Sequence, residues 1–143
     1  MIVKSFETNK VNIAETKKIL LYGKNEGFKK EIIECFINKK ENIYNYEEKE
    51  ILAEKDYFLE NILSGSLFDE EKIIIIKRAT EKIFPLINEI NEKDIESIAI
   101  IISSENLDKK SKLRTFFEKS KKYACVAFYP DNDQTLYKLS FNF

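Results

Sequence analysis

Three short apolar runs without polar alternation restrict most strongly what this chain can fold into. They are Lys72 to Lys77 (KIIIIK), Ser97 to Ser103 (SIAIIIS) and Tyr123 to Phe128 (YACVAF). A strand with one wet face alternates apolar and polar residues, whereas a strand covered on both faces is apolar throughout and rich in β-branched residues. The runs therefore predict buried strands, and the four isoleucines from Ile73 to Ile76 predict a central one.

Helical patterns stand between these runs, so strands and helices alternate along the chain. Lys18 to Tyr22 (KILLY) and the weaker Asn42 to Tyr46 (NIYNY) bring the expected strands to five. We expect helices, from apolar residues at three- and four-residue spacing, at positions 28–38, 51–63, 85–91 and 106–120. The alternation predicts an α/β fold with a five-stranded, mostly parallel sheet and helices on both faces. Its 143 residues fit one domain, residues 1–143.

Composition restricts location and partners. No apolar run is long enough to span a bilayer, and Met1 to Lys10 lacks the apolar stretch of a signal peptide, so we expect a cytoplasmic protein. The net charge of −1 gives no overall attraction for nucleic acid. The last segment, Gln134 to Phe143, begins an apolar pattern that stops at the chain end, and we interpret the chain as the front piece of a longer protein.

We find no set of residues for an enzyme active site. The chain has no histidine, which removes the Ser/His and Cys/His nucleophiles and the common zinc sites. Cys35 and Cys125 have no partner at metal-ligand spacing, and we expect both to be buried as small hydrophobic side chains. We therefore expect no catalytic residue, no bound metal and no cofactor.

The turn after the first strand, Gly23 to Gly27 (GKNEG), resembles a phosphate-binding loop. A functional loop has Lys and then a hydroxyl residue directly after its second glycine, but Phe28 and Lys29 fill those positions and the spacing is one residue short. The central strand ends in Lys77-Arg78, without the carboxylate that would hold magnesium. We expect a degenerate site, and a nucleotide-binding domain using the two glycines and Lys24 is the alternative.

The segment around the fourth helix is basic. It is either a phosphate-facing surface or a solvated helix face, and a pairing of Glu118 with Lys122 favours the second interpretation. The basic residues are Lys109, Lys110, Lys112, Arg114, Lys119, Lys121 and Lys122.

Leu67 and Phe68 stand in the connection between a helix and the isoleucine strand, and Asp69 to Glu71 follow them. Such connections normally run over the surface. One interpretation packs both side chains into the core, where Leu and Phe are usually found. The other projects them as anchors of a protein-binding site, because two adjacent large side chains do not easily face one core.

Three stretches, in this order and spacing, resemble the N-terminal domain of the delta subunit of the bacterial DNA polymerase III clamp loader. They are ILLYGKNEGFKKE (19–31), SGSLFDEEKIIIIKRATEKI (64–83) and SIAIIISSENLDKKSKLRTFFEKSKKYACVAFYPD (97–131). The resemblance implies an AAA+-like, P-loop NTPase-type sheet whose nucleotide site has been lost. It implies further that the remaining domains of the full subunit are absent from this chain.

The family's delta subunit does not hydrolyse ATP but binds the ring-shaped sliding clamp, the DNA polymerase III beta subunit, and helps to open it for loading onto DNA. On this chain the resemblance assigns clamp binding to Leu63, Gly65, Ser66, Leu67 and Phe68. The family motif often begins with Gln, and no Gln occurs near Leu63. Contacts with the other loader subunits are expected through the missing domains, and contacts with DNA in the assembled complex.

Overall fold

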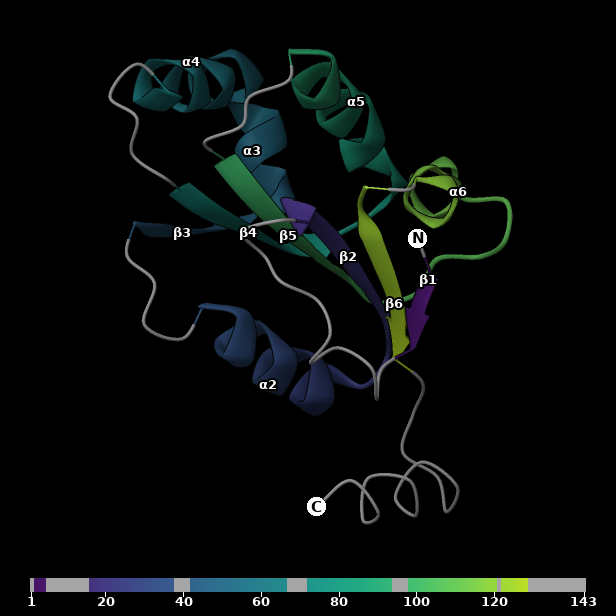
Figure 1. Ribbon diagram of the computed structural model, residues 1–143. Helices are drawn as coiled ribbons and strands as arrows, with labels where there is room; N and C mark the ends of the chain where they lie inside the picture. The colour runs from purple at the N-terminus through teal and green to yellow at the C-terminus, as the bar shows by residue number, and fades with distance from the viewer. Residues whose placement is uncertain are drawn as a thin grey trace.

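The computed structural model describes residues 2–4, 16–37, 42–66, 72–93, 98–120 and 122–128, with the backbone alone at 2–4 and 62–66. The strands are β1 (Ile2–Lys4), β2 (Lys18–Gly23), β3 (Ile43–Glu47), β4 (Lys72–Ala79), β5 (Ile98–Ser104) and β6 (Ala124–Phe128). The helices are α2 (Glu26–Ile37), α3 (Glu48–Ala53), α4 (Lys55–Ser66), α5 (Phe84–Lys93) and α6 (Lys112–Lys119). Within these residues the fold is α/β (Figure 1).

The strands form one parallel sheet in the order β1-β6-β2-β5-β4-β3. The five expected strands are β2 to β6, and the expectation of a parallel sheet flanked by helices is confirmed. The sheet has one more strand than expected, because β1 pairs Ile2 with Cys125 of β6 at the edge. Three residues are too few to produce a recognisable pattern in the sequence.

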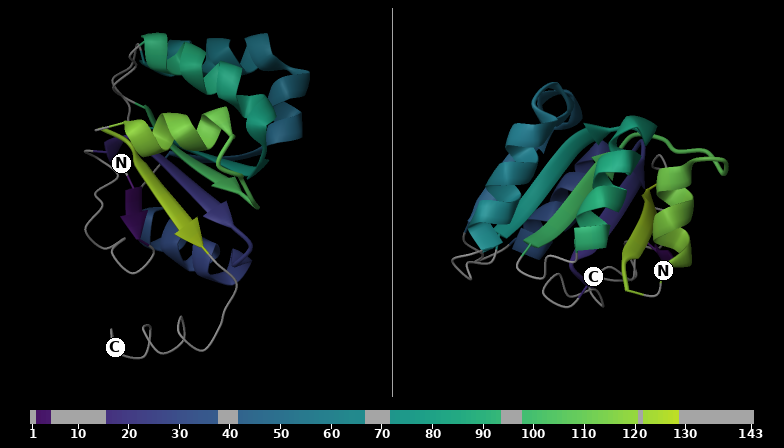
Figure 2. Two further views of the ribbon diagram at one scale, coloured as in Figure 1. Left: turned by 90° about the vertical axis from the view of Figure 1, so that its right-hand side faces the viewer. Right: turned by 90° about the horizontal axis from the view of Figure 1, so that it is seen from above.

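Helices cover both faces of the sheet. Figures 1 and 2 show α2 on one face and α3, α4, α5 and α6 on the other. Ile73 and Ile75 belong to the core cluster that includes Ile33 of α2, whereas Ile74 and Ile76 belong to the cluster under the other helices. The isoleucine run has no polar alternation because both faces of β4 are buried.

Two helices differ from the sequence prediction. The helix expected at positions 51–63 is broken at Glu54, where α3 ends and α4 follows. The helix expected from Asn106 begins only at Lys112, because Ser111 caps it by accepting a hydrogen bond of 3.1 Å from the Arg114 amide. Pro85 lies in the first turn of α5, as the sequence predicts.

The two cysteines have different environments. Cys125 is buried, as expected, but Cys35 is exposed on α2, so the expectation of burial was wrong for this residue. Cys35 lies between the buried residues Ile33 and Phe36 of α2. The rotation of the helix from one residue to the next places Cys35 on the side of α2 that faces away from the sheet.

No helix in the described ranges is both long and apolar enough to cross a membrane.

Candidate functional site

The carboxyl ends of β2 and β5 meet at the point where a parallel sheet most often binds ligands. These strands are neighbours, with Tyr22 in register with Ser104. The helices that follow them lie on opposite faces, α2 on one and α6 on the other (Figure 1). Such a reversal opens a crevice beyond the strand ends. The glycine-containing turn therefore lies where a nucleotide site would be.

The turn itself is short, and three backbone amides at and next to it donate hydrogen bonds within the protein. Only Lys24 and Asn25 separate β2 from α2. The Asn25 side-chain oxygen accepts from the Phe28 amide at 3.1 Å, and the Gly23 amide donates to the Glu105 carbonyl oxygen. The Glu26 amide donates to the Lys24 carbonyl oxygen at 2.9 Å. These three amides therefore have partners within the protein.

The two glycines have different surroundings. Gly23 has a φ of +122°, and a Cβ built there would lie 1.7 Å from the Phe128 carbonyl oxygen of β6. Gly23 is therefore required by the close approach of two backbones. Gly27 lies in the first turn of α2, where an added Cβ would meet nothing within 4 Å.

Lys29 is the most deeply buried charged side chain near this turn, with 1% of its surface exposed. Its ammonium group donates to the Ser104 carbonyl oxygen at 2.8 Å and to the Glu26 carboxylate at 2.6 Å. Lys24, the cation of the alternative nucleotide hypothesis, is exposed. The buried cation at this edge is thus engaged by the protein's own oxygen atoms.

The carboxyl end of β4 is irregular. The pairing with β5 shifts between Ile76 and Ala79, and Arg78 has a φ of +54°. Beyond it the buried Glu48 carboxylate accepts from the Thr80 amide at 2.8 Å and from the Thr80 hydroxyl. These bonds fix the strand end against α3. Among the described residues no three side chains of the types that hold a metal ion are grouped together.

Two cavities flank this edge of the sheet. One, of about 710 Å³, lies between Arg78 and the segment from Ser104 to Lys112, and the other, of about 500 Å³, lies between α2 and the ends of β4 and β5. Both linings mix acidic and basic side chains, such as Glu105 with Arg78. Mixed charges of this kind do not define one class of ligand.

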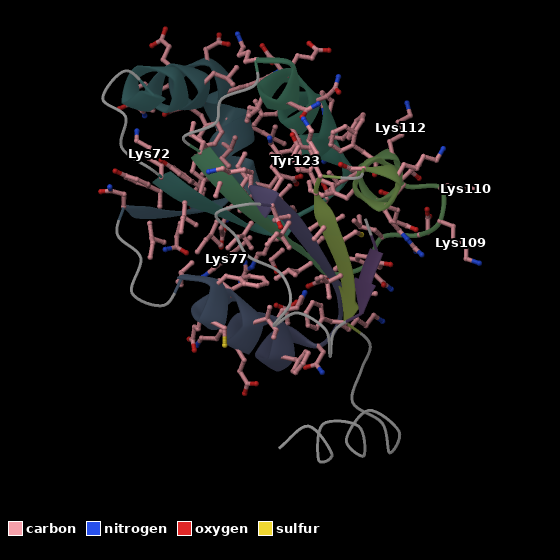
Figure 3. The ribbon with its side chains drawn as sticks, viewed as in Figure 1. Lys72, Lys77, Lys109, Lys110, Lys112 and Tyr123 are labelled. Atoms are coloured by element: carbon pink, nitrogen blue, oxygen red, sulfur yellow. The ribbon has the colours of Figure 1, made fainter. Side chains whose placement is uncertain are left out.

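The basic segment is largely a solvated face. Lys109, Lys110 and Lys112 are exposed and point away from the body of the molecule (Figure 3). The expected pairing of Glu118 with Lys122 is wrong. Glu118 instead accepts from Arg114, and Lys122 lies beyond the end of α6.

Arg114 is held in place on the inner side of the same helix. Its guanidinium also donates to the Leu107 carbonyl oxygen at 3.0 Å and lies 5.0 Å from the centre of the Tyr22 ring. It is therefore a structural residue rather than a free cation. Lys121 lies outside the described residues.

The residues assigned to clamp binding lie at and beyond the end of α4. The backbone of Leu63, Gly65 and Ser66 is helical, so the helix continues past position 63, where the expected helix ends. Leu67, Phe68 and Asp69 to Glu71 lie outside the described residues. Whether Leu67 and Phe68 project or pack inward therefore stays a prediction.

Two exposed aromatic residues on β3 and α4 were not predicted from the sequence. Tyr44 of β3 is 39% exposed and Tyr57 of α4 is 62% exposed. Lys72, which opens β4, lies with its ammonium 5.6 Å from the centre of the Tyr44 ring. The polar alternation of NIYNY was the available signal, because it is typical of an edge strand with one wet face.

No protein-family model matches this sequence, and the comparison with curated proteins finds no significant match. The resemblance to clamp-loader delta subunits therefore rests on the residues of the chain itself.

Proposed function

We propose that this domain binds the ring-shaped sliding clamp of DNA polymerase III as the clamp-contacting part of a clamp-loader delta subunit. The observation that carries the proposal is the connection that contains Leu67 and Phe68. It consists of residues 67–71, between a helix that continues through Ser66 and a strand that begins at Lys72. Two large apolar residues in so short a connection are candidates for a projecting contact.

The rigidity of the flanking elements supports an anchoring role. β4 is buried between β3 and β5, and its Ile73 to Ile76 side chains fill both core clusters. Residues 67–71 thus connect a helix to a central strand of the sheet. Leu67 and Phe68 are the proposed anchors, and Asp69 to Glu71 are the proposed polar rim.

The sheet order supports an AAA+-like module. We number the five expected strands by their order in the sequence, so that β2 is the first and β6 the fifth. Across the sheet from β6 to β3 they then lie in the order fifth, first, fourth, third, second. This order is compatible with P-loop-type folds, and it differs from the flavodoxin-like order 2-1-3-4-5, in which the first strand lies between the second and the third rather than between the fifth and the fourth.

We propose further that the domain does not hydrolyse ATP, and the hydrogen bonds around Gly23 support this. The Phe28, Glu26 and Gly23 amides donate to oxygen atoms of Asn25, Lys24 and Glu105. The buried Lys29 donates to Ser104. We propose that the module acts by binding alone, in the cytoplasm. Other loader subunits would be engaged through further domains of a complete delta subunit, and DNA would be contacted in the assembled complex.

The size of the anchors limits the strength of the complex. Burying a Leu or a Phe contributes roughly 1.5 to 3 kcal/mol each. A micromolar complex requires about 8 kcal/mol. The two anchors therefore need a supporting surface around them.

Calorimetric titration of purified clamp into this domain tests the proposal. Leu67→Ala and Phe68→Ala should each raise the Kd by about tenfold or more, because each removes a side chain from a desolvated pocket. Cys35→Ser is the matched control, since Cys35 is exposed on α2, across the sheet from α4. Unchanged affinity of both alanine variants, with the fold intact, would refute the proposed anchors.

Nucleotide binding is the second candidate function, and the position of Gly23 to Gly27 at the crevice between β2 and β5 favours it. Thermal unfolding with and without Mg-ATP separates the two. We expect no shift of Tm, whereas a rise of several degrees would establish a nucleotide site and contradict the proposed loss.

A further inference from the structure

β3 lies at one edge of the sheet, and half of its backbone groups point away from every described strand. It is last in the strand order and pairs on one side only, with β4 (Figure 1). The Asn42 carbonyl oxygen accepts from the Ile73 amide at 3.0 Å, so it points toward β4. Because the direction of the backbone groups alternates along a strand, those of Ile43, Asn45 and Glu47 point outward.

This edge lacks the features by which proteins usually prevent pairing with an exposed strand. Such features are a lysine, a proline, a β-bulge or a very short strand. β3 has five residues, IYNYE, without lysine or proline, and its register with β4 is continuous from Ile43 to Glu47. Tyr44 and Asn45 are exposed. The backbone of β3 is therefore able to accept a further strand.

The centre of β3 has the same residues in both directions, because Asn45 stands between Tyr44 and Tyr46. A second β3 that runs antiparallel about a two-fold axis at Asn45 would place Tyr44 opposite Tyr46 of the second copy. Aromatic pairs across strands are favourable. Asn45 would lie opposite its own copy, and an amide side chain, which has both a donor and an acceptor, can pair with an identical one.

The backbone fits the same arrangement. The amide and the carbonyl group of Asn45 both point outward, so two copies of Asn45 form a hydrogen-bonded antiparallel pair that exchanges both bonds. Ile43 then pairs with Glu47 of the second copy in the same way, since their backbone groups also point outward.

The charges fit it as well. Glu47 is the one charged residue of β3, and it would face the apolar Ile43 of the second copy. The two Glu47 residues would be four positions apart along the strands, which is roughly 14 Å. This separation exceeds the screening length of about 8 Å at physiological salt. No like charges therefore lie opposite each other within the paired strands.

We propose that two copies of this chain associate through β3 into a two-fold symmetric dimer, in which an antiparallel junction joins the two parallel sheets. The second copy is the occupant because one symmetry axis satisfies the Tyr44-Asn45-Tyr46 sequence, the outward backbone groups and the Glu47 charges together. A five-residue edge is small for an interface, so the dimer forms at high protein concentration. The inference does not depend on clamp binding.

Sedimentation velocity of the purified chain tests the inference. The chain should be a monomer at about 1 μM and largely a dimer at about 1 mM, as expected for a weak complex. Asn45→Lys should raise the Kd of the dimer by about five-fold or more, because two like charges would meet at the axis. Asn106→Lys is the matched control. Asn106 is exposed between β5 and α6, so its substitution should leave the Kd unchanged.

Two results of this experiment would overturn the inference. Equal dimerisation of Asn45→Lys and Asn106→Lys would show that the copies meet through another surface. A chain that stays monomeric at about 1 mM would show that this edge does not pair with its own copy, and would leave it to a strand of another protein.

The register of the junction is tested by cross-linking. Asn45→Cys, made together with Cys35→Ser to remove the exposed native thiol, should give a disulfide-linked dimer under mild oxidation, because position 45 meets its own copy at the axis. Asn106→Cys in the same background is the control and should cross-link much more slowly. Equal rates for the two variants would refute the proposed register.

Amide hydrogen exchange of the unchanged chain, followed by NMR, keeps the inference testable if a variant does not fold. The outward amides of Asn45 and Glu47 should exchange several-fold more slowly at about 1 mM than at about 50 μM, because the second copy protects them. The amides of Tyr44 and Tyr46 point toward β4 and should change little. Outward amides that exchange at the same rate at both concentrations would overturn the inference.

Discussion

The ammonium group of Lys29 donates a hydrogen bond of 2.8 Å to the carbonyl oxygen of Ser104, the last residue of β5. The bond joins α2, the helix that follows β2, to the strand beside β2, across the crevice where parallel sheets bind ligands. Lys29 also donates to the Glu26 carboxylate, so its ammonium is engaged by two oxygen atoms of the protein itself.

Lys29→Met should lower the free energy of unfolding by about 1 to 3 kcal/mol, because it removes hydrogen bonds from a buried cation to Ser104 and Glu26. Urea unfolding followed by circular dichroism measures the change. Lys30→Met is the matched control. Lys30 is exposed, so its substitution should change the free energy of unfolding by no more than about 0.5 kcal/mol. Equal effects of the two substitutions would contradict the structural role of Lys29.

The two glycines of the turn should respond in opposite directions to alanine. Gly23→Ala should destabilise by about 3 kcal/mol or more, because its φ is +122° and the new Cβ would meet the Phe128 carbonyl oxygen. Gly27→Ala should be neutral or stabilise by up to about 1 kcal/mol, because a Cβ there has room and alanine favours the helix.

Chemical denaturation of both glycine variants measures these changes. Destabilisation by Gly27→Ala comparable to that by Gly23→Ala would contradict the open surroundings of Gly27. Loss of an ATP-dependent rise in Tm in Gly27→Ala would instead support the nucleotide hypothesis.

The two thiols should react at different rates. Burial, with a smaller contribution from Glu118, raises the pKa of Cys125 to about 12, so its thiolate is scarce near pH 8. Cys35 is exposed. A disulfide reagent at pH 8 should therefore modify one thiol quickly in the folded protein and both in denaturant. Rapid modification of folded Cys35→Ser would show that Cys125 is accessible and contradict its burial.

The sheet was predictable because the residue pattern within each strand is enough to identify that strand. Ile73 to Ile76 and Ile98 to Ile102 have no polar alternation, and a strand with both faces covered requires that pattern. The break at Glu54 was not predictable, since α3 and α4 read as one periodic pattern and only their packing on the sheet separates them.

The glycine-containing turn after the first strand was predictable, because Gly23 and Gly27 stand between a strand pattern and a helix pattern. The roles of Lys29 and Arg114 were not, because they depend on Ser104 and Leu107, which are distant in sequence or separated by a turn. The exposure of Cys35 was missed because its neighbours Ile33 and Phe36 are both buried. Exposure of a single helical residue depends on the exact rotation of the helix against the sheet.

Binding of the purified sliding clamp to this domain, measured by calorimetry alongside the Leu67→Ala, Phe68→Ala double variant, tests the central claim most directly. We predict a measurable complex with the unchanged domain. In the double variant the Kd should rise by about a hundredfold or more, because both proposed anchor side chains are truncated. Equal binding by the two proteins, or no binding by either, would contradict the account.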